Sequence, residues 1–210
     1  MAQTDQPATS LSSVSETIVR EYFELHEFLV RQHRKYIVQT RREEDDIDFF
    51  VLNPHPQKRE VAMPFVLASP DLPFVERAIV VVKGWHTETF SSAVLTHAPE
   101  IFRFVAAKVF QQAVRAFGKD GAPTKILVVP ALPQAAQARD QSIALLRSKG
   151  VDAVIPFRTM LTDLVEHTEV NRNYQKSDLL QIIRILKNYD FFKEAQMELF
   201  KSKRRKHRPA

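Results

Sequence analysis

Apolar positions along this chain change from a helical period to short continuous runs and back. The first pattern has a helical spacing, so it predicts an amphipathic helix from about 14 to 31, carried by Val14, Ile18, Tyr22, Leu25 and Leu29. The stretch 36–40 has the composition of a first strand. Two short, mainly apolar runs, at 47–52 and 78–85, are typical of buried strands.

The rest of the chain alternates between the two patterns. A helix is expected at 101–117, ended by Gly118, and a strand at 125–129. After them come a helix at 134–148, a strand at 152–155, a helix at 158–167, and a last helix opened by Ser177 or Asp178. The order is α-β-β-β-α-β, then an α-β-α extension and a C-terminal helix. It predicts an α/β domain with a mixed sheet.

The composition predicts one domain with polar ends. Residues 1–13 are rich in Ser, Thr and Gln and lack the apolar core of a secretory signal, so we interpret them as a disordered leader before a single domain at 14–195. No apolar run reaches the roughly 20 residues that span a bilayer, and no membrane association is expected. The absence of cysteine excludes disulfides and cysteine–zinc sites and suits a cytoplasmic protein.

The net charge of +5 comes from the C-terminus. Without the last ten residues, 24 of the 30 basic side chains remain against 25 acidic ones, a net charge of −1. A basic arm on a near-neutral domain fits contact with phosphates irrespective of sequence, although a solubilising terminus explains it equally well. The predicted nucleic-acid contacts are Lys201, Lys203, Arg204, Arg205, Lys206 and Arg208.

Each of the two apolar runs carries one ionisable group where an apolar residue is expected. Asp48 lies in the first run and Lys83 in the second. Burying either charge costs several kcal/mol unless it is paired or binds a metal. By strand alternation, Asp48 should share a face with Phe50 and Leu52. The two groups are therefore either a functional site or a structural ion pair with each other.

These two runs resemble the D…(D/E)-x-K signature of the PD-(D/E)XK, restriction-endonuclease-like nucleases, with Val81 in place of the second acid. The resemblance covers roughly residues 14–130 and implies an αβββαβ core. It also implies that Asp48 binds magnesium, or manganese, and that Lys83 positions the attacking water or stabilises charge on the phosphate. Val81 can neither position the water nor stabilise charge on the phosphate, so the signature supports the fold better than the chemistry.

The resemblance suggests two further acids for this site. In the Holliday-junction-resolvase branch an acid near the start of the first helix joins the site, and Glu16 has that place as a second metal ligand; a capping box with Ser13 is the alternative. Some relatives carry the missing acid on the next helix, where Glu100 is the best candidate, ahead of Glu88. A solvated acid at a helix start is the alternative for both.

A pentapeptide near the C-terminus, Gln196-Met197-Glu198-Leu199-Phe200, resembles the peptide by which bacterial polymerases and repair proteins dock on the sliding clamp. Met197, Leu199 and Phe200 would supply apolar anchors, and Gln196 would orient the peptide by hydrogen bonds. The alternative is that these side chains pack on the domain itself. Residues 196–210 are thus predicted to form an exposed peptide and a basic tail.

Three functions remain open from the sequence. The first is a metal-dependent endonuclease or phosphodiesterase of DNA repair or defence. The second is a catalytically inactive nuclease-fold module that binds DNA or a protein such as the sliding clamp. The third is a protein-interaction domain without affinity for nucleic acid. A homodimer is compatible with all three.

Overall fold

The structure is a computed structural model that describes residues 11–32, 46–118 and 121–192. Within them the sheet has five strands in the order β1-β2-β3-β4-β5. β2 pairs antiparallel with both β1 and β3, whereas β4 pairs parallel with both β3 and β5. The strands are β1 (Leu29–Gln32), β2 (Phe49–Leu52), β3 (Arg77–Val82), β4 (Thr124–Val129) and β5 (Ala153–Pro156). The predicted α/β class with a mixed sheet is confirmed; the strand expected at 36–40 lies outside the described residues.

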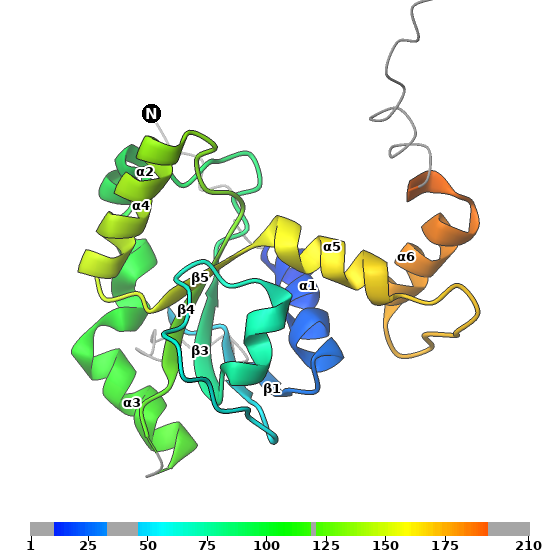
Figure 1. The fold of residues 1–210 in the computed structure, drawn as a ribbon, viewed down its shortest axis with the longest axis horizontal. Coiled ribbons are helices and arrows are strands. Elements are labelled where there is room, and N and C mark those ends of the chain that lie inside the picture. The colour runs from blue at the N-terminus through cyan, green and yellow to red at the C-terminus, as the bar shows by residue number, and fades with distance from the viewer. Residues whose placement is uncertain (1–10, 33–45, 119–120, 193–210) are drawn as a thin grey trace, which may run out of the picture. The chain divides into compact units, whose positions relative to one another are not determined.

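Helices lie on both sides of this sheet, with α1 on one side and α2, α3 and α4 on the other (Figure 1). The helices are α1 (Leu11–Leu25), α2 (Ser92–His97), α3 (Ala107–Phe117), α4 (Ala136–Ser148), α5 (Phe157–His167) and α6 (Asp178–Asn188), with the 3-10 helices η2 (Ser69–Phe74) and η3 (Pro99–Val105).

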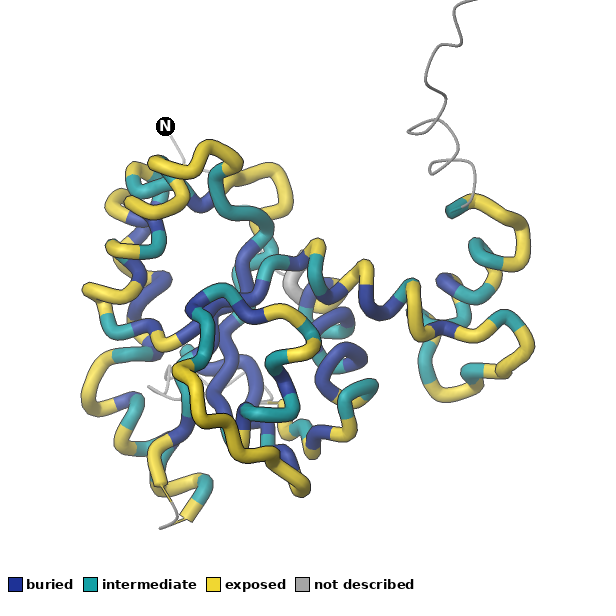
Figure 2. Tube along the Cα trace, in the orientation of Figure 1, coloured by how far each residue is buried: buried dark blue, intermediate teal, exposed yellow. Residues whose placement is uncertain are grey.

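The central strands are buried on both faces, which explains their uninterrupted apolar sequence (Figure 2). On one face, alternate residues of β3 and β4 join a core cluster with side chains from η3 and α3. The residues between them are equally buried on the other face. There α1 contributes a buried hydrophobic stripe at helical spacing, formed by Ile18, Val19, Tyr22 and Phe23.

The first helix ends at Leu25, six residues before the predicted end. The chain leaves it through Glu27, whose φ is +62°. The Phe28 N–H donates to the Phe23 carbonyl and the Glu27 N–H to the Glu24 carbonyl, both at 3.0 Å. These bonds form a Schellman motif, completed by the edge-to-face contact of the Phe23 and Phe28 rings. Because glutamate, not glycine, holds the left-handed position, the sequence gives little warning of this stop.

The helix predicted at 101–117 is two helices. A 3-10 helix, η3, runs to Val105, and α3 begins at Ala107. Ala106 between them has an extended ψ of 137°. The break lets the crowded apolar side chains of η3 and the regularly spaced ones of α3 reach the same core, which one continuous helix would spread around its axis.

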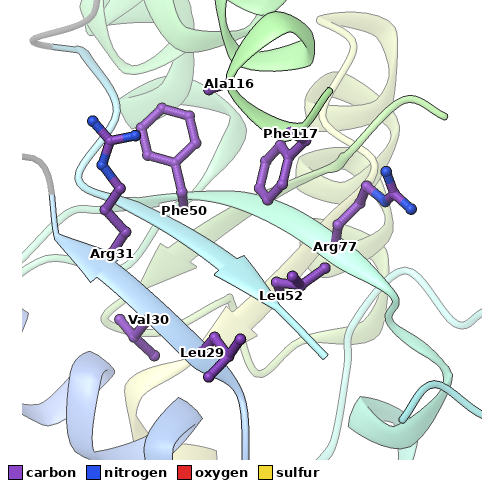
Figure 3. A pocket seen from close by; sticks show the side chains of 8 residues that line it. All are labelled: Leu29, Val30, Arg31, Phe50, Leu52, Arg77, Ala116 and Phe117. Atoms are coloured by element: carbon purple, nitrogen blue, oxygen red, sulfur yellow. The ribbon is translucent and has the colours of Figure 1, made fainter. Parts of the chain in front are cut away.

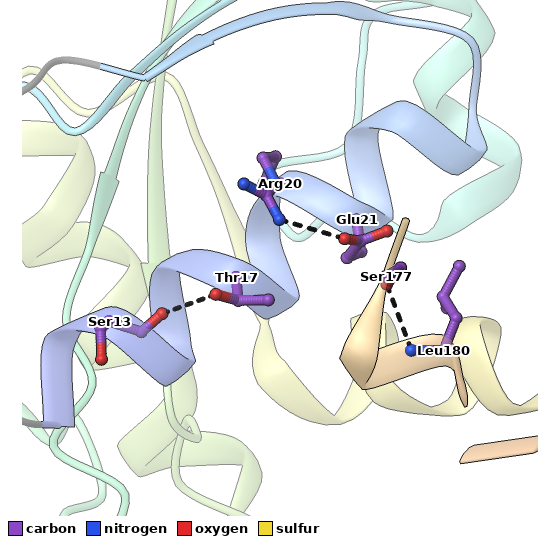
Figure 4. Close-up of polar contacts among 6 residues, drawn as sticks. All are labelled: Ser13, Thr17, Arg20, Glu21, Ser177 and Leu180. Carbon is purple, nitrogen blue, oxygen red and sulfur yellow. Dashed lines mark hydrogen bonds and ion pairs between the residues drawn. The ribbon is translucent and has the colours of Figure 1, made fainter. Parts of the chain in front are cut away.

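The chain divides into two compact units, one to Asp163 and one from Leu164. In the second unit, Ser177 caps α6 as predicted, because its side chain accepts the Leu180 N–H at 3.2 Å (Figure 4). The Lys187 ammonium on α6 donates to three backbone carbonyls, those of Val165, Glu166 and Thr168. The described residues contain no helix that is both long and apolar enough to cross a membrane.

Candidate functional site

Asp48 lies directly before β2 and ends the pairing of β2 with β3. Its N–H donates to the Val80 carbonyl at 3.1 Å, although the partner of Val80 in the ladder is Phe49. Asp48 and Phe49 thus both lie opposite Val80, as in a β-bulge. The Asp48 carboxylate Oδ2 then accepts the Val82 N–H at 2.7 Å, which gives this backbone donor a side-chain acceptor in place of a carbonyl.

The bulge changes the predicted orientation of the residues at the start of β2. Strand alternation places Ile47 with Phe49 and Val51, and Asp48 with Phe50. In the structure, Ile47 and Phe50 belong to the same core cluster and Phe49 does not. The predicted alternation is therefore wrong between 47 and 50, because the extra residue of a bulge resets it.

Lys83 follows β3 directly, and its backbone N–H donates to the Val128 carbonyl of β4 at 3.0 Å. Its side chain is half-buried. The Asp48 carboxylate is bonded to the residue immediately before Lys83, so these two predicted site residues lie at adjacent strand ends. This is the amino end of β2 and the carboxyl end of β3.

Val81 is 1% exposed and belongs to the core cluster with Ile79, Leu127 and Val129. A carboxylate in this apolar layer would need a cation or several donors to offset its desolvation. The surroundings of Val81 are those of a core residue.

Glu16 lies on α1 and reaches the same end of the sheet. Its Oε2 accepts the Gln32 Nε2–H at 2.7 Å, and Gln32 pairs with Phe49, the residue after Asp48. α1 begins at Leu11, so Ser13 is inside the helix and not at its N-cap. The capping-box alternative for Glu16 is therefore wrong, and its contact with β1 brings it toward Asp48.

Glu100 is an exposed residue in the first turn of η3. In the residues that the structure describes, no contact joins it to Asp48 or Lys83. Its place as the migrated acid stays a prediction, as does that of Glu88, an exposed residue of the turn after β3.

Two residues that the sequence did not single out as a pair connect α1 to the turn after β3. The Ser15 Oγ and the His86 Nε2 are 2.9 Å apart, and the His86 ring packs edge-on against Phe157 with its centroid at 4.6 Å. A Cβ atom on Gly84 would lie only 2.5 Å from the Ser15 Oγ. Glycine is thus required for α1 to approach this turn so closely, and His86, three residues after Lys83, stays exposed.

Trp85, between them, is 38% exposed and lies against the buried Phe90, with ring centroids 5.7 Å apart. One side of the indole therefore covers the core, which favours a packing role over base stacking.

The residues present meet the needs of a magnesium ion only in part. Asp48 and Glu16 offer carboxylate oxygens, the ligands that magnesium prefers, but one oxygen of each is already hydrogen-bonded. Across residues 11–32, 46–118 and 121–192, no group of three acidic or histidine side chains is placed to hold a metal ion. The donor set at this sheet end therefore does not by itself complete a metal site.

The predicted tail contacts from Lys201 to Arg208 and the clamp-like peptide from Gln196 to Phe200 lie outside the described residues. Comparison of the chain with models of known families, with curated proteins and with solved structures finds no match.

Proposed function

We propose that this chain is a nuclease-like protein that associates with DNA and receives the phosphate backbone at the sheet end formed by Asp48, Lys83 and the start of α1. One observation carries the proposal: the Asp48 carboxylate accepts the N–H of the residue before Lys83. An acid and a lysine on neighbouring strand ends are what the D…(D/E)-x-K signature requires of these positions.

Two further observations support this proposal. The described elements follow the order α1-β1-β2-β3, then helices and β4, with an antiparallel meander followed by a parallel strand. His86 adds a group that can donate to phosphate oxygens, and its ring is held by Ser15 and Phe157 in the turn that follows Lys83. Lys83 and His86 can both donate to an anionic ligand.

Whether the protein hydrolyses DNA or only binds it depends on the acids. Hydrolysis with magnesium or manganese would use Asp48 and Glu16, with Lys83 stabilising charge on the phosphate. Binding without hydrolysis is favoured by Val81, whose core position leaves the signature without its second acid, and by the use of Asp48 Oδ2 in the strand ladder. The inactive module is therefore a second candidate function with its own support.

Binding is tested by fluorescence anisotropy with labelled single-stranded, duplex and branched DNA over a series of salt concentrations. Lys83→Ala should weaken binding severalfold and lower the salt dependence by about one phosphate contact. The matched control is Lys149→Ala, an exposed lysine at the end of α4. Equal affinities for both variants and the wild type would refute the proposed site, and no binding at all would leave the protein-interaction alternative.

Hydrolysis is tested separately, with the same substrates in magnesium or manganese. Cleavage abolished by both Asp48→Asn and Lys83→Ala would establish the enzyme. Binding without cleavage would establish the inactive module in its place, and cleavage that survives both substitutions would refute Asp48 and Lys83 as the catalytic residues.

A further inference from the structure

A trough lies on the sheet face that carries α3, beyond the end of that helix. The register of β1, β2 and β3 shows which side chains line it. Arg31, Phe50 and Ile79 form one cross-strand row on this face, and Leu29, Leu52 and Arg77 form the next. α3 ends at Phe117 and covers Ile79 but not the outer parts of β1 and β2. The cavity that remains has a volume of about 390 Å³, within the range of small-molecule sites.

The floor of the trough is aromatic and aliphatic. The Phe50 and Phe117 rings lie with centroids 5.7 Å apart and planes tilted by 56°, and Leu52 continues the apolar surface. Leu29, on the edge strand β1, lies at its rim and is 61% exposed. Such a surface fits a flat apolar ring system.

Both charged groups of the lining are guanidinium groups, and they stand at opposite sides of the two phenylalanine rings (Figure 3). The exposed Arg31 has its Cζ 5.7 Å from the centre of the Phe50 ring. Within the described chain it has no carboxylate partner. It therefore leaves five donors beside the apolar floor.

Arg77 is the second guanidinium of the lining. Its side chain is 11% exposed and is paired with Glu76, its neighbour in sequence. A guanidinium has five N–H donors, and one carboxylate satisfies at most two of them. Arg77 therefore adds a guanidinium to the other side of the trough that is already paired with a carboxylate.

We propose that this trough binds a small amphipathic anion, an aromatic acid whose ring lies on Phe50 and Phe117 and whose acidic group is held by Arg31. The site does not depend on the proposed DNA function. Its row of Leu52 and Arg77 lies at the opposite end of β2 and β3 from Asp48 and Lys83, whereas Phe50 and Arg31 lie closer to Asp48.

The test uses two fluorescent probes on the full-length protein: anilinonaphthalene sulfonate and its uncharged analogue, phenylnaphthylamine. The wild type should bind one sulfonate probe, more tightly than the neutral one. Arg31→Gln should weaken the sulfonate at least about tenfold and leave the neutral probe nearly unchanged, since a charge-assisted bond is lost. Arg103→Gln, an exposed arginine of η3, is the matched control and should change neither.

Ala116→Trp provides a second variant that fills the trough from the exposed last turn of α3 and should abolish binding of both probes. The proposal is overturned if the wild type binds no sulfonate probe, or if Ala116→Trp binds it as the wild type does. It is also overturned if Arg31→Gln weakens both probes equally, because the site would then be an apolar groove without anion recognition.

Discussion

Replacing Asp48 with alanine removes the acceptor of the Val82 N–H at the end of the β2–β3 ladder. Asp48 is 8% exposed, so water cannot easily replace the lost carboxylate. A hydrogen bond to a buried charge contributes about 1.5–3 kcal/mol, and an unsatisfied backbone donor costs a similar amount. We therefore expect Asp48→Ala to lower the free energy of unfolding by about 2 kcal/mol. In urea, with a typical dependence of about 2 kcal/mol per molar, the midpoint should fall by about 1 M.

Asp48→Asn separates this structural role from the chemical one. The amide oxygen can still accept the Val82 N–H, so this variant should retain most of the stability, with a loss of less than about 1 kcal/mol. A neutral amide is nevertheless a poor magnesium ligand. A folded Asp48→Asn protein is thus the proper variant for any test of hydrolysis.

The matched control is Asp152→Ala. Asp152 Oδ2 accepts the Lys125 N–H at 2.8 Å at the start of β4, the same kind of bond, but its side chain is 44% exposed. Water can satisfy the freed donor there, so the expected loss is below about 1 kcal/mol. If Asp48→Ala shifts the urea midpoint no more than Asp152→Ala does, the ladder role assigned to Asp48 is refuted.

Three other outcomes are expected. Burial raises the pKa of the Tyr22 hydroxyl above its ordinary value of 10, so the folded state keeps a proton that the unfolded chain loses, and stability falls as the pH rises past 10. Tyr22→Phe should flatten this fall in urea titrations between about pH 9 and 11, and equal slopes would contradict the burial argument. Gly84→Ala should cost about 1–3 kcal/mol through collision with Ser15, and Ser15→Ala should recover part of it; additive losses would contradict the contact. Lys187→Met should speed hydrogen exchange in α6 more than the exposed control Lys176→Met, because it removes bonds to three carbonyls. Equal rates would show that those bonds do not hold the helix.

Features set by neighbouring residues were predicted from the sequence. The apolar runs of β3 and β4 identified buried strands, and Ser177 marked the start of α6. These signals are local, since a strand buried on both faces needs apolar residues throughout and a helix start needs an acceptor for its free N–H groups. The α/β class follows from the order of such elements.

Two features of the backbone were not predicted. Glu27 adopts a left-handed conformation in a local motif closed by Phe23 and Phe28, but no glycine signals it. The bulge at Asp48 depends on β3, more than 30 residues later in the chain. Only the bulge is a case in which a distant contact overrides the local pattern.

Of the candidate site, too, only the features with a local signal were predicted from the sequence. The charges of Asp48 and Lys83 stand out in apolar runs, so the sequence alone identified them. The contact of Ser15 with His86 joins residues 71 positions apart, and only the close approach of α1 to Gly84 creates it. The trough between Arg31 and Arg77 likewise depends on where α3 ends above the sheet, which strand register and helix length set together.

The most direct test of the central claim is hydrogen exchange of the full-length protein with and without DNA. The account predicts slower exchange on DNA binding at the end of β3 and the following turn, from Lys83 to Glu88, and in the first turns of α1. Slower exchange confined to the basic residues from Lys201 to Arg208, or no change anywhere at saturating DNA, would contradict it.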